Sequence, residues 1–474
     1  MRPLEIFLPI LLVAYLISRF FNIPSPQLAR ALQALPLIAM LVVLAHLATE
    51  GYRWQMIPLY VLTAALLVHS LPALLDSTRL AAPVRGWRAA ASFLTLMLVG
   101  VATAVPYLLP VPRISKASGP YQVGTKIFEL TDESRKELYS GRDESRRFMV
   151  QVWYPSSPTA QDVRAPWMQD AHIYARAIAG DLLELPPYFM DHLALSVTPA
   201  YKDSAIDESG APFPVILFSH GWNGFAAQNS NQMIELASQG YVVIGLQHTY
   251  GAVVTIFPDG TAAKNNPDAL PEAEGMTNEE YEPIARTLLH QWSADLSYTL
   301  DQLGAGKLIP VSAVDLTRVG AFGHSTGGGA VIEFCGTDSR CIAVLGMDPF
   351  LRPVSVEVLN RGLTQPSLLM FSEEWAGNTT SRNNELFKAL YPNLQNSLGV
   401  FVIAGTRHYD FTDLPLLTPL APQLGLKGLI KGPRVVRIIN DYLIAFFNHT
   451  LKGADFSLPL SETDLYPELD WRTP

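Results

Sequence analysis

The feature of this chain that most constrains its fold is a tight, glycine-rich turn between an apolar run and a run of small residues. The apolar run is Val319–Phe322, and the turn after it reads Gly-His-Ser-Thr-Gly at positions 323–327. The apolar run is typical of a buried strand, and the small residues after the turn are typical of a helix packed closely on a sheet. A serine at the centre of such a turn has its Oγ exposed above the sheet. A side chain at either flanking glycine would collide with the neighbouring strand or helix.

This strand, turn and helix predict the nucleophile elbow of an α/β-hydrolase, with Ser325 as the nucleophile. The helix that begins after Ser325 directs its unpaired backbone N–H groups towards the point where an oxyanion would form. A glycine-rich turn that only closes a β-α-β unit is the alternative, because Gly-x-Ser-x-Gly arises by chance in roughly one chain in six of this length. The motif alone therefore does not distinguish a nucleophile elbow from such a turn, and the elements around it have to be considered.

Apolar runs of strand length alternate with longer runs of helical pattern through most of the C-terminal part. The predicted strands are 213–219, 241–246, 319–322, 342–347, 367–371 and 399–403, and the predicted helices are 227–239, 279–303 and 434–451. Residues 146–154 partly alternate between polar and apolar side chains, which is typical of an edge strand. The alternation predicts a mainly parallel sheet covered by helices on both faces.

Four apolar stretches precede this domain, at 6–21, 31–49, 54–75 and 89–111. The last three carry no formal charge, and each is long enough to cross a hydrocarbon core of about 30 Å. The first is shorter and contains Arg19, whose side chain would have to reach the interface. Because three further stretches follow it, we do not interpret it as a signal peptide.

These patterns predict three regions. Residues 1–112 form four transmembrane helices, 113–140 form a linker, and 141–474 form the α/β-hydrolase domain. The protein is therefore expected to be an integral membrane protein of the plasma or inner membrane.

Basic residues in the short connectors predict the orientation. The connectors after the first and third stretches contain Arg19, Arg30, Arg79, Arg85 and Arg88, and the opposite face carries fewer basic residues. Since basic residues concentrate on the cytoplasmic side, these connectors are expected in the cytoplasm. With an even number of spans, the large domain would then be extracytoplasmic.

Two histidines, His46 and His69, lie inside the apolar stretches, where an ionisable residue is a functional hypothesis by default. We expect both to hydrogen-bond between helices instead. The stretches lack paired charges in their interiors, which disfavours a transporter.

The two cysteines, Cys335 and Cys341, are close enough in sequence for a local disulfide, which would imply an oxidising compartment. Two free thiols near a helix end fit the sequence equally well.

Composition excludes several classes of function. The net charge is −9 and no basic stripe is present, which argues against nucleic acid as a partner. The sequence contains no Walker, Rossmann or His-Glu-x-x-His pattern and no Cys/His metal-ligand spacing. We therefore expect no metal and no organic cofactor, and the sequence leaves the oligomeric state open.

A serine nucleophile needs a base, and in this fold the acid and then the histidine follow the serine along the chain. Two histidines lie downstream, His408 and His449. His449 falls in the predicted closing helix, where a packing or surface role is expected. His408 lies in a loop directly after the strand at 399–403, where such a base has to be, so we predict His408 as the base.

The predicted acid is Asp348, which ends the strand at 342–347. A carboxylate there can accept a hydrogen bond from the imidazole Nδ1–H and stabilise the imidazolium. Asp410 and Asp413 are the rivals, and we expect both to be solvated.

The predicted oxyanion hole consists of two backbone N–H groups. One belongs to Thr326, the residue after the nucleophile, and the other to Trp222, in the His-Gly-Trp loop after the strand at 213–219. The remaining histidines of the domain core, His220, His248 and His324, are expected to shape the site.

Four segments together resemble the plasma (type II) platelet-activating factor acetylhydrolase family: Phe218-Ser-His-Gly221, Gly323-His-Ser-Thr-Gly-Gly328, Asp348 after the next strand, and Gly405-Thr-x-His408. The stretch at 185–193 also resembles bacterial members, and the resemblance covers roughly 122–451. It implies an α/β-hydrolase fold and a calcium-independent serine esterase that acts on short or oxidised acyl chains of phospholipids, or on small esters.

The same resemblance carries the family's nucleophile, acid and base over to Ser325, Asp348 and His408, and its oxyanion donors to Trp222 and Thr326. The four apolar stretches depart from the secreted member of that family. The expected partners are a small ester or phospholipid substrate and the membrane.

Two further classes stay open on the sequence alone. A general lipase, a polyester hydrolase or a dienelactone-type hydrolase would use the same fold. A non-catalytic membrane-bound binding or sensing module would not need all three groups of the triad.

Overall fold

The computed structural model describes residues 1–76, 83–459, 461 and 464–472, and it divides into two compact units. The helical unit comprises Met1–Pro112, Asp191–Ser196 and Leu417–Leu420, and the sheet unit comprises Arg113–Met190, Val197–Leu416 and Ala421–Pro474. Arg79, one of the arginines used to predict the orientation, lies outside the described residues.

The sheet unit is built on a sheet of eleven described strands in the order β13-β12-β11-β10-β9-β5-β6-β2-β1-β4-β3. These are β1 Gln122–Lys136, β2 Ser145–Ser156, β3 Arg164–Pro166, β4 Val197–Lys202, β5 Phe213–Ser219, β6 Val242–Gln247, β9 Val314–His324, β10 Cys341–Met347, β11 Pro366–Ser372, β12 Asn396–Ile403 and β13 Leu469–Arg472. Six strands that are consecutive in this sheet are parallel, so their carboxyl ends meet at one edge: β12, β11, β10, β9, β5 and β6. Strands β7 Val254–Ile256 and β8 Ala262–Lys264 form a separate hairpin.

The helices of the sheet unit connect these strands. They are α6 Ala171–Ala177, α7 Ser230–Ser238, α8 Asn278–Gly304, α9 Thr326–Thr337, α10 Val356–Arg361, α11 Glu373–Gly377, α12 Arg382–Leu390 and α13 Gly432–Lys452. Shorter helical turns are η3 Ile178–Leu182, η5 Glu208–Gly210, η6 Pro267–Ala269, η7 Val311–Ala313, η8 Tyr391–Asn393, η9 His408–Phe411 and η10 Leu414–Leu417, and η4 Pro187–Leu195 includes residues of both units.

Helices cover both faces of the sheet, as β9 illustrates. Val319 and Ala321 belong to the buried apolar cluster that also contains residues of α8 and α9. A side chain on Gly320, between them, would instead meet Phe447 of α13. Because successive strand residues point to opposite faces, α8 and α9 lie on one face and α13 on the other. The α/β fold predicted from the sequence is confirmed.

Two predictions about the first strands are wrong. Residues 122–136, placed in the predicted linker at 113–140, form β1, which pairs antiparallel with β2 along most of its length. β2 is not an edge strand, because β6 pairs with its other side. The polar side chains of β2 suggested an exposed edge. Arg146 is nevertheless fully buried, because ion pairs with Glu137 and Asp295 compensate its charge.

The two cysteines of the sheet unit are joined in a disulfide. Cys335 lies near the end of α9 and Cys341 begins β10. Of the two possibilities that the sequence left open, the structure contains the bonded form.

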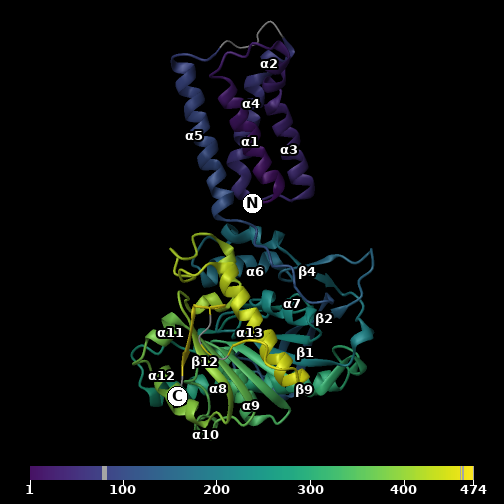
Figure 1. The fold of residues 1–474 in the computed structure, drawn as a ribbon, viewed down its shortest axis with the longest axis vertical. Helices are drawn as coiled ribbons and strands as arrows, with labels where there is room; N and C mark the ends of the chain where they lie inside the picture. The colour runs from purple at the N-terminus through teal and green to yellow at the C-terminus, as the bar shows by residue number, and fades with distance from the viewer. Residues whose placement is uncertain (77–82, 460, 462–463, 473–474) are drawn as a thin grey trace. The chain divides into compact units, whose positions relative to one another are not determined.

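The helical unit contains α1 Pro3–Ser18, α2 Pro26–Gln33, α3 Leu35–Thr49, the turn η1 Trp54–Met56, α4 Ile57–Leu75 and α5 Trp87–Leu108. Helices α1, α3, α4 and α5 lie alongside one another (Figure 1). Their shared core is formed by side chains such as Leu12, Val43 and Leu59.

Among the described residues, three helical stretches are long and apolar enough to cross a membrane: Pro26–Thr49, Trp54–Leu75 and Trp87–Leu108. The sequence predicted four. The remaining helix, α1, has 16 residues and is about 24 Å long, which is less than the roughly 30 Å of a hydrocarbon core. Length and composition therefore support three of the four predicted spans.

One of the two histidines in the apolar helices behaves as expected. His46 Nδ1 lies 3.0 Å from the Tyr60 hydroxyl, so it links α3 to α4. His69 of α4 makes no hydrogen bond to the described residues and lines a cavity instead.

Candidate active site

The predicted nucleophile, Ser325, lies on a strained turn between β9 and α9. Its backbone has φ 56° and ψ −122°, which non-glycine residues rarely adopt. A Cβ on Gly323 would lie 2.3 Å from the Gly327 carbonyl oxygen, and one on Gly327 would lie 2.1 Å from that of Ser219. A side chain at either glycine would therefore collide with the backbone, as the sequence pattern predicted.

His408 and Asp348 are hydrogen-bonded to each other. His408 Nδ1 lies 3.0 Å from Asp348 Oδ2, across 60 positions of sequence. Asp348 follows β10, and His408 lies in the loop after β12, so both side chains come from the carboxyl ends of parallel strands that flank β11. Ser325 follows β9 at the same edge, which brings the three predicted residues to one end of the sheet.

The Asp348 carboxylate is held by Ser372 at the end of β11. The Ser372 backbone N–H donates to Oδ1 at 2.7 Å, and its hydroxyl donates to Oδ2 at 2.6 Å. Burial raises the pKa of Asp348, and the two bonds from Ser372 oppose that rise. The carboxylate is therefore fixed in position, and its remaining partner is His408.

His408 is enclosed by other rings. The Trp375 ring stacks on it with centroids 4.3 Å apart and an interplanar angle of 4°. The Nε2–H of His324 donates to the His408 carbonyl oxygen at 3.0 Å. This burial lowers the pKa of the His408 imidazole, so that it stays neutral and able to accept a proton.

The loop after β5 lies directly against the nucleophile. A Cβ on Gly221 would lie 3.2 Å from the Cβ of Ser325. The backbone N–H of Trp222, the next residue, and that of Thr326, the first residue of α9, donate to no acceptor among the described residues. Two unsatisfied donors beside Ser325 are what an oxyanion hole requires.

The Ser325 hydroxyl makes no hydrogen bond within 3.5 Å to the described residues, although its backbone bonds to Met347 and Phe350. Contacts between a nucleophile and its base are often long without substrate and shorten in the Michaelis complex. The open hydroxyl is therefore compatible with His408 as its base.

The two rival acids make hydrogen bonds to other groups, and they are not solvated as the sequence analysis expected. Both Asp410 and Asp413 are buried rather than solvated. Asp410 accepts from the backbone N–H groups of Arg407 and Gly428. Asp413 accepts from the Asn231 side-chain amide at 2.7 Å, and burial raises its pKa to about 7.

His449 lies on α13, and its Nδ1 bonds to the Ala454 carbonyl oxygen at 2.8 Å. It lies in the last turn of α13, which agrees with the packing or surface role that the sequence predicted.

A second serine, histidine and aspartate lie in one row beneath the oxyanion loop. Ser219 Oγ lies 2.9 Å from His248 Nε2, and His248 Nδ1 lies 3.0 Å from Asp295 Oδ2. All three side chains are fully buried. Asp295 also pairs with the buried Arg146 through two bonds, of 2.6 and 3.1 Å.

This row supports the loop rather than forming a second active site. The His248 backbone N–H donates to His220 Nε2 at 3.2 Å, and His220 Nδ1–H donates to the Gly221 carbonyl oxygen at 2.7 Å. The Trp292 ring stacks on His248 and closes it off. The sequence predicted that His220 and His248 shape the site, but it did not find Asp295, because residues from β5, β6 and α8 meet only in the fold.

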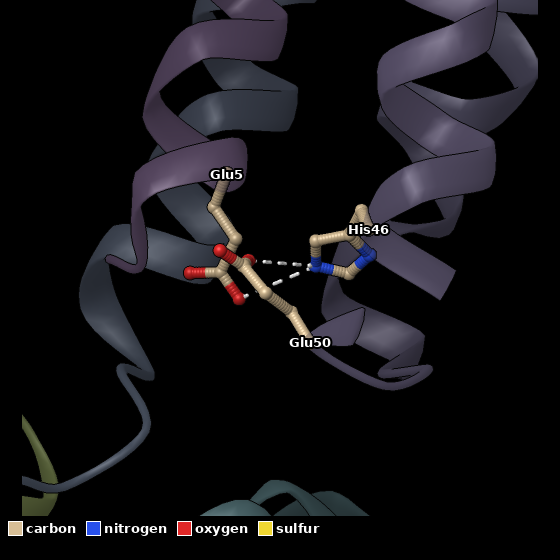
Figure 2. A group of neighbouring side chains, drawn as sticks. All are labelled: Glu5, His46 and Glu50. Atoms are coloured by element: carbon tan, nitrogen blue, oxygen red, sulfur yellow. Dashed lines mark ion pairs between the residues drawn. The ribbon is translucent and has the colours of Figure 1, made fainter. Parts of the chain in front are cut away.

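One further group of side chains has the types that could hold a metal ion. The ligand atoms of Glu5, His46 and Glu50 lie within 4.8 Å of one another (Figure 2). Arginines already balance the charge, since Arg53 Nη1 lies 2.8 Å from Glu5 Oε1, and Arg2 pairs with Glu5 at 2.9 Å. Arg2 also lies 3.2 Å from His46 Nε2. This cluster is therefore explained as an ion-pair network that joins α1 to α3.

The fold and the buried Asp–His pair beside a strained serine define an α/β-hydrolase of the esterase class. Comparison with known proteins identifies the family within this class. The model of the family "Platelet-activating factor acetylhydrolase, isoform II" matches residues 110–305 and 310–459, so the chain belongs to this family. It is a carboxylic ester hydrolase.

Several relatives have names that agree with this assignment. The platelet-activating factor acetylhydrolase of Cavia porcellus is 27% identical over 71% of this chain and 78% of its own. A probable 1-alkyl-2-acetylglycerophosphocholine esterase of Arthroderma benhamiae is 28% identical over 79% of this chain and 96% of its own. The structure of a ferulic acid esterase from Streptomyces cinnamoneus superimposes with a TM-score of 0.63 at 23% identity, covering 77% of this chain and all of that one. That structural likeness bears on the fold alone.

Proposed function

We propose that this protein is a membrane-anchored serine esterase that removes short or oxidised acyl groups from phospholipids. Ser325 is the nucleophile, His408 the base, Asp348 the group that orients the base, and the N–H groups of Trp222 and Thr326 hold the oxyanion. The observation that carries this proposal is the 3.0 Å bond between His408 Nδ1 and the buried Asp348 carboxylate.

In the first step, His408 Nε2 takes the proton from the Ser325 hydroxyl as its Oγ forms a bond to the ester carbonyl carbon. The carbonyl π electrons move to the oxygen, and the two backbone N–H groups donate to that oxyanion. Asp348 accepts the Nδ1–H and stabilises the imidazolium. The intermediate then collapses, the carbon–oxygen bond to the glycerol breaks, and His408 gives its proton to the leaving oxygen.

In the second step, water replaces the alcohol. His408 removes a proton from the water, the hydroxide attacks the acyl carbon, and the bond to Ser325 Oγ breaks as His408 returns a proton to it. The products are a free fatty acid and a lysophospholipid, and the enzyme regains its starting state.

The substrate class rests on the relatives. Those named above include a platelet-activating factor acetylhydrolase and a probable 1-alkyl-2-acetylglycerophosphocholine esterase. A general lipase, a polyester hydrolase and a dienelactone-type hydrolase remain alternatives, and the length of the acyl chain that is cleaved separates them.

The membrane anchor is supported by the surface of the helical unit. Only 33%, 22% and 22% of the apolar windows in its three long helices is buried inside the protein. Leu41, Val61 and Val101 are examples of apolar side chains that face outwards, at 58%, 61% and 67% exposed. A lipid environment would cover this surface.

We further propose that the sheet unit is extracytoplasmic. The arginines at the connectors favour it, and a disulfide such as Cys335–Cys341 persists in oxidising compartments. Protease added to intact cells that express the chain should degrade the sheet unit. Its survival until the membrane is permeabilised would reverse the proposed orientation.

Hydrolysis of p-nitrophenyl esters and of phosphatidylcholines with graded acyl chains tests the function. The purified full chain should cleave acetyl to butyryl esters, and Ser325→Ala should abolish this activity. Ser209→Ala, which changes an exposed serine, is the matched control. Activity only on long chains would favour a lipase, and activity that survives Ser325→Ala would refute the proposed nucleophile. A fluorophosphonate probe should label the wild type and not Ser325→Ala.

A further inference from the structure

The helical unit contains a cavity of about 810 Å³ that the esterase reaction does not use. Helices α1, α2, α4 and α5 and the segment that precedes α5 contribute its walls. Its polar lining includes Arg19, Arg85, Arg88, His69, Gln33 and Ser92.

The three guanidinium groups of this cavity lack a carboxylate partner in the part of the chain that the structure describes. No ion pair within 4 Å joins Arg19, Arg85 or Arg88 to a described residue. Other arginines, such as Arg53 and Arg146, do pair with a carboxylate. Arg19 lies over the Tyr15 ring at 5.9 Å, and Arg88 lies over the Trp87 ring at 5.8 Å.

The described carboxylates of the apolar helices and their connectors do not line the cavity. Glu5 and Glu50 belong to the ion-pair network with Arg2 and Arg53. Asp76 follows α4 and is not part of the lining. The cavity therefore carries a concentrated positive charge that no lining residue neutralises.

An orphaned hydrogen-bonding group lies in the same wall. The Ser92 side chain is 2% exposed, and its Oγ has no hydrogen-bond partner among the described residues. A buried hydroxyl without a partner costs about 1–3 kcal/mol, so an acceptor from outside the chain would relieve this cost. The lining offers donors from Arg, Ser and Gln side chains, and few groups to accept from them.

Phosphate oxygens match this set of donors. A guanidinium binds phosphate through two parallel charge-assisted hydrogen bonds, and basic pockets between membrane helices recognise anionic headgroups. Apolar side chains next to the lining residues face outwards, including Leu71 at 40%, Leu94 at 61% and Leu75 at 85% exposed. They offer a surface along which acyl chains can lie.

We propose that this cavity binds the phosphate headgroup of an anionic phospholipid, with Arg19, Arg85 and Arg88 contacting the phosphate and Ser92 donating a further hydrogen bond. The proposal rests on the insertion of the helical unit in a membrane, and not on the esterase chemistry. Three guanidinium groups favour a lipid of net negative charge over one whose choline cation would face them.

Native mass spectrometry of the full chain in non-ionic detergent tests the site, because membrane orientation then has no influence. Dioleoylphosphatidylglycerol should bind at least about tenfold more tightly than dioleoylphosphatidylcholine, the least that a charge-assisted bond is worth. Arg19→Gln combined with Arg88→Gln should remove this preference, and the two Arg→Lys changes should retain part of it. Arg30→Gln, an exposed arginine of α2 that does not line the cavity, should leave it unchanged.

The other outcomes either refute the proposal or show that the bound anion is free phosphate instead of a lipid headgroup. Equal binding of the two lipids, or an equal loss with Arg30→Gln, would refute the site. Inorganic phosphate that displaces the anionic lipid fully at millimolar concentration would show the predicted phosphate chemistry but a free anion as the ligand. Hydrolysis of p-nitrophenyl acetate, measured on the same samples, should be unchanged by all these variants. Its absence in the wild type would refute the esterase and leave the lipid result to stand.

Discussion

Gly221 and Ser325 approach so closely that a Cβ on the glycine would lie 3.2 Å from the Cβ of the serine and 3.1 Å from His324 Nδ1. The loop that carries the Trp222 N–H therefore touches the nucleophile turn with no room for a side chain between them. Any shift of this loop moves a proposed oxyanion donor relative to the carbon that Ser325 attacks.

Gly221→Ala should lower kcat by about ten- to a hundredfold and leave KM nearly unchanged, because the donor is used mainly in the transition state. Steady-state hydrolysis of p-nitrophenyl acetate measures both constants. Gly432→Ala is the control, since a Cβ there meets nothing within 4 Å. A loss confined to KM would show that Gly221 shapes substrate binding rather than the oxyanion hole.

Asp348→Asn should lower kcat on the order of 10⁴-fold, because the amide no longer fixes the tautomer of His408 or stabilises its imidazolium. Steady-state hydrolysis of p-nitrophenyl acetate measures this loss.

The same variant should also change how the stability of the fold depends on pH. The pKa of Asp348 is raised in the folded state, so the carboxyl group favours folding at low pH and this contribution is lost as the pH rises above 3.8. Thermal unfolding at pH 4 and pH 8 should therefore show a smaller decline with rising pH in the variant. A steeper decline would contradict the direction of this shift.

Trp375→Ala should move the acidic limb of the pH–rate profile to higher pH by on the order of one unit. Stacking against Trp375 helps to bury His408, and burial lowers the pKa of the imidazole. With the ring exposed, His408 would be protonated at a higher pH and lose its function as a base. Trp375→Phe, which keeps an aromatic ring, should largely restore the wild-type profile of kcat/KM. An unchanged limb in Trp375→Ala would show that this stack does not set the pKa.

Asp295→Asn should destabilise the protein by about 3–5 kcal/mol in urea unfolding, because it leaves the buried Arg146 charge without its bidentate partner. Asp315→Asn breaks the more exposed pair with Arg318 and should cost about 0–1 kcal/mol. Equal effects of the two variants would contradict the structural importance of the buried pair.

Ser219→Ala separates the support of the oxyanion loop from global stability. Loss of the hydroxyl leaves His248 Nε2 without its partner, at a cost of about 1–3 kcal/mol. If the row positions the loop, kcat should fall severalfold while KM and the urea m-value stay constant. Wild-type kcat in a folded Ser219→Ala variant would limit the row to a structural role.

Local patterns in the sequence were sufficient for most of the sheet unit. The run at 213–219 matches β5 in full, and 279–303 falls within α8 Asn278–Gly304. β1 was not predicted because it contains many charged residues, and β2 was predicted as an edge strand because it contains Arg146. Only the pairing of these strands with each other, and of Arg146 with Asp295, makes such residues compatible with a buried sheet.

The sequence by itself determined the turn at Ser325, because small residues on both sides are required by contacts within a few positions along the chain. It also determined the order of the acid and the base, since that order follows from strands that succeed one another. Only the tertiary structure decided which distant groups hold them. Ser372 on Asp348, Trp375 on His408, and Asp295 beneath the oxyanion loop come from separate elements. The first two contacts arise where parallel strands end at one edge, and the third arises where α8 packs on the sheet. No local spacing in the sequence encodes such contacts.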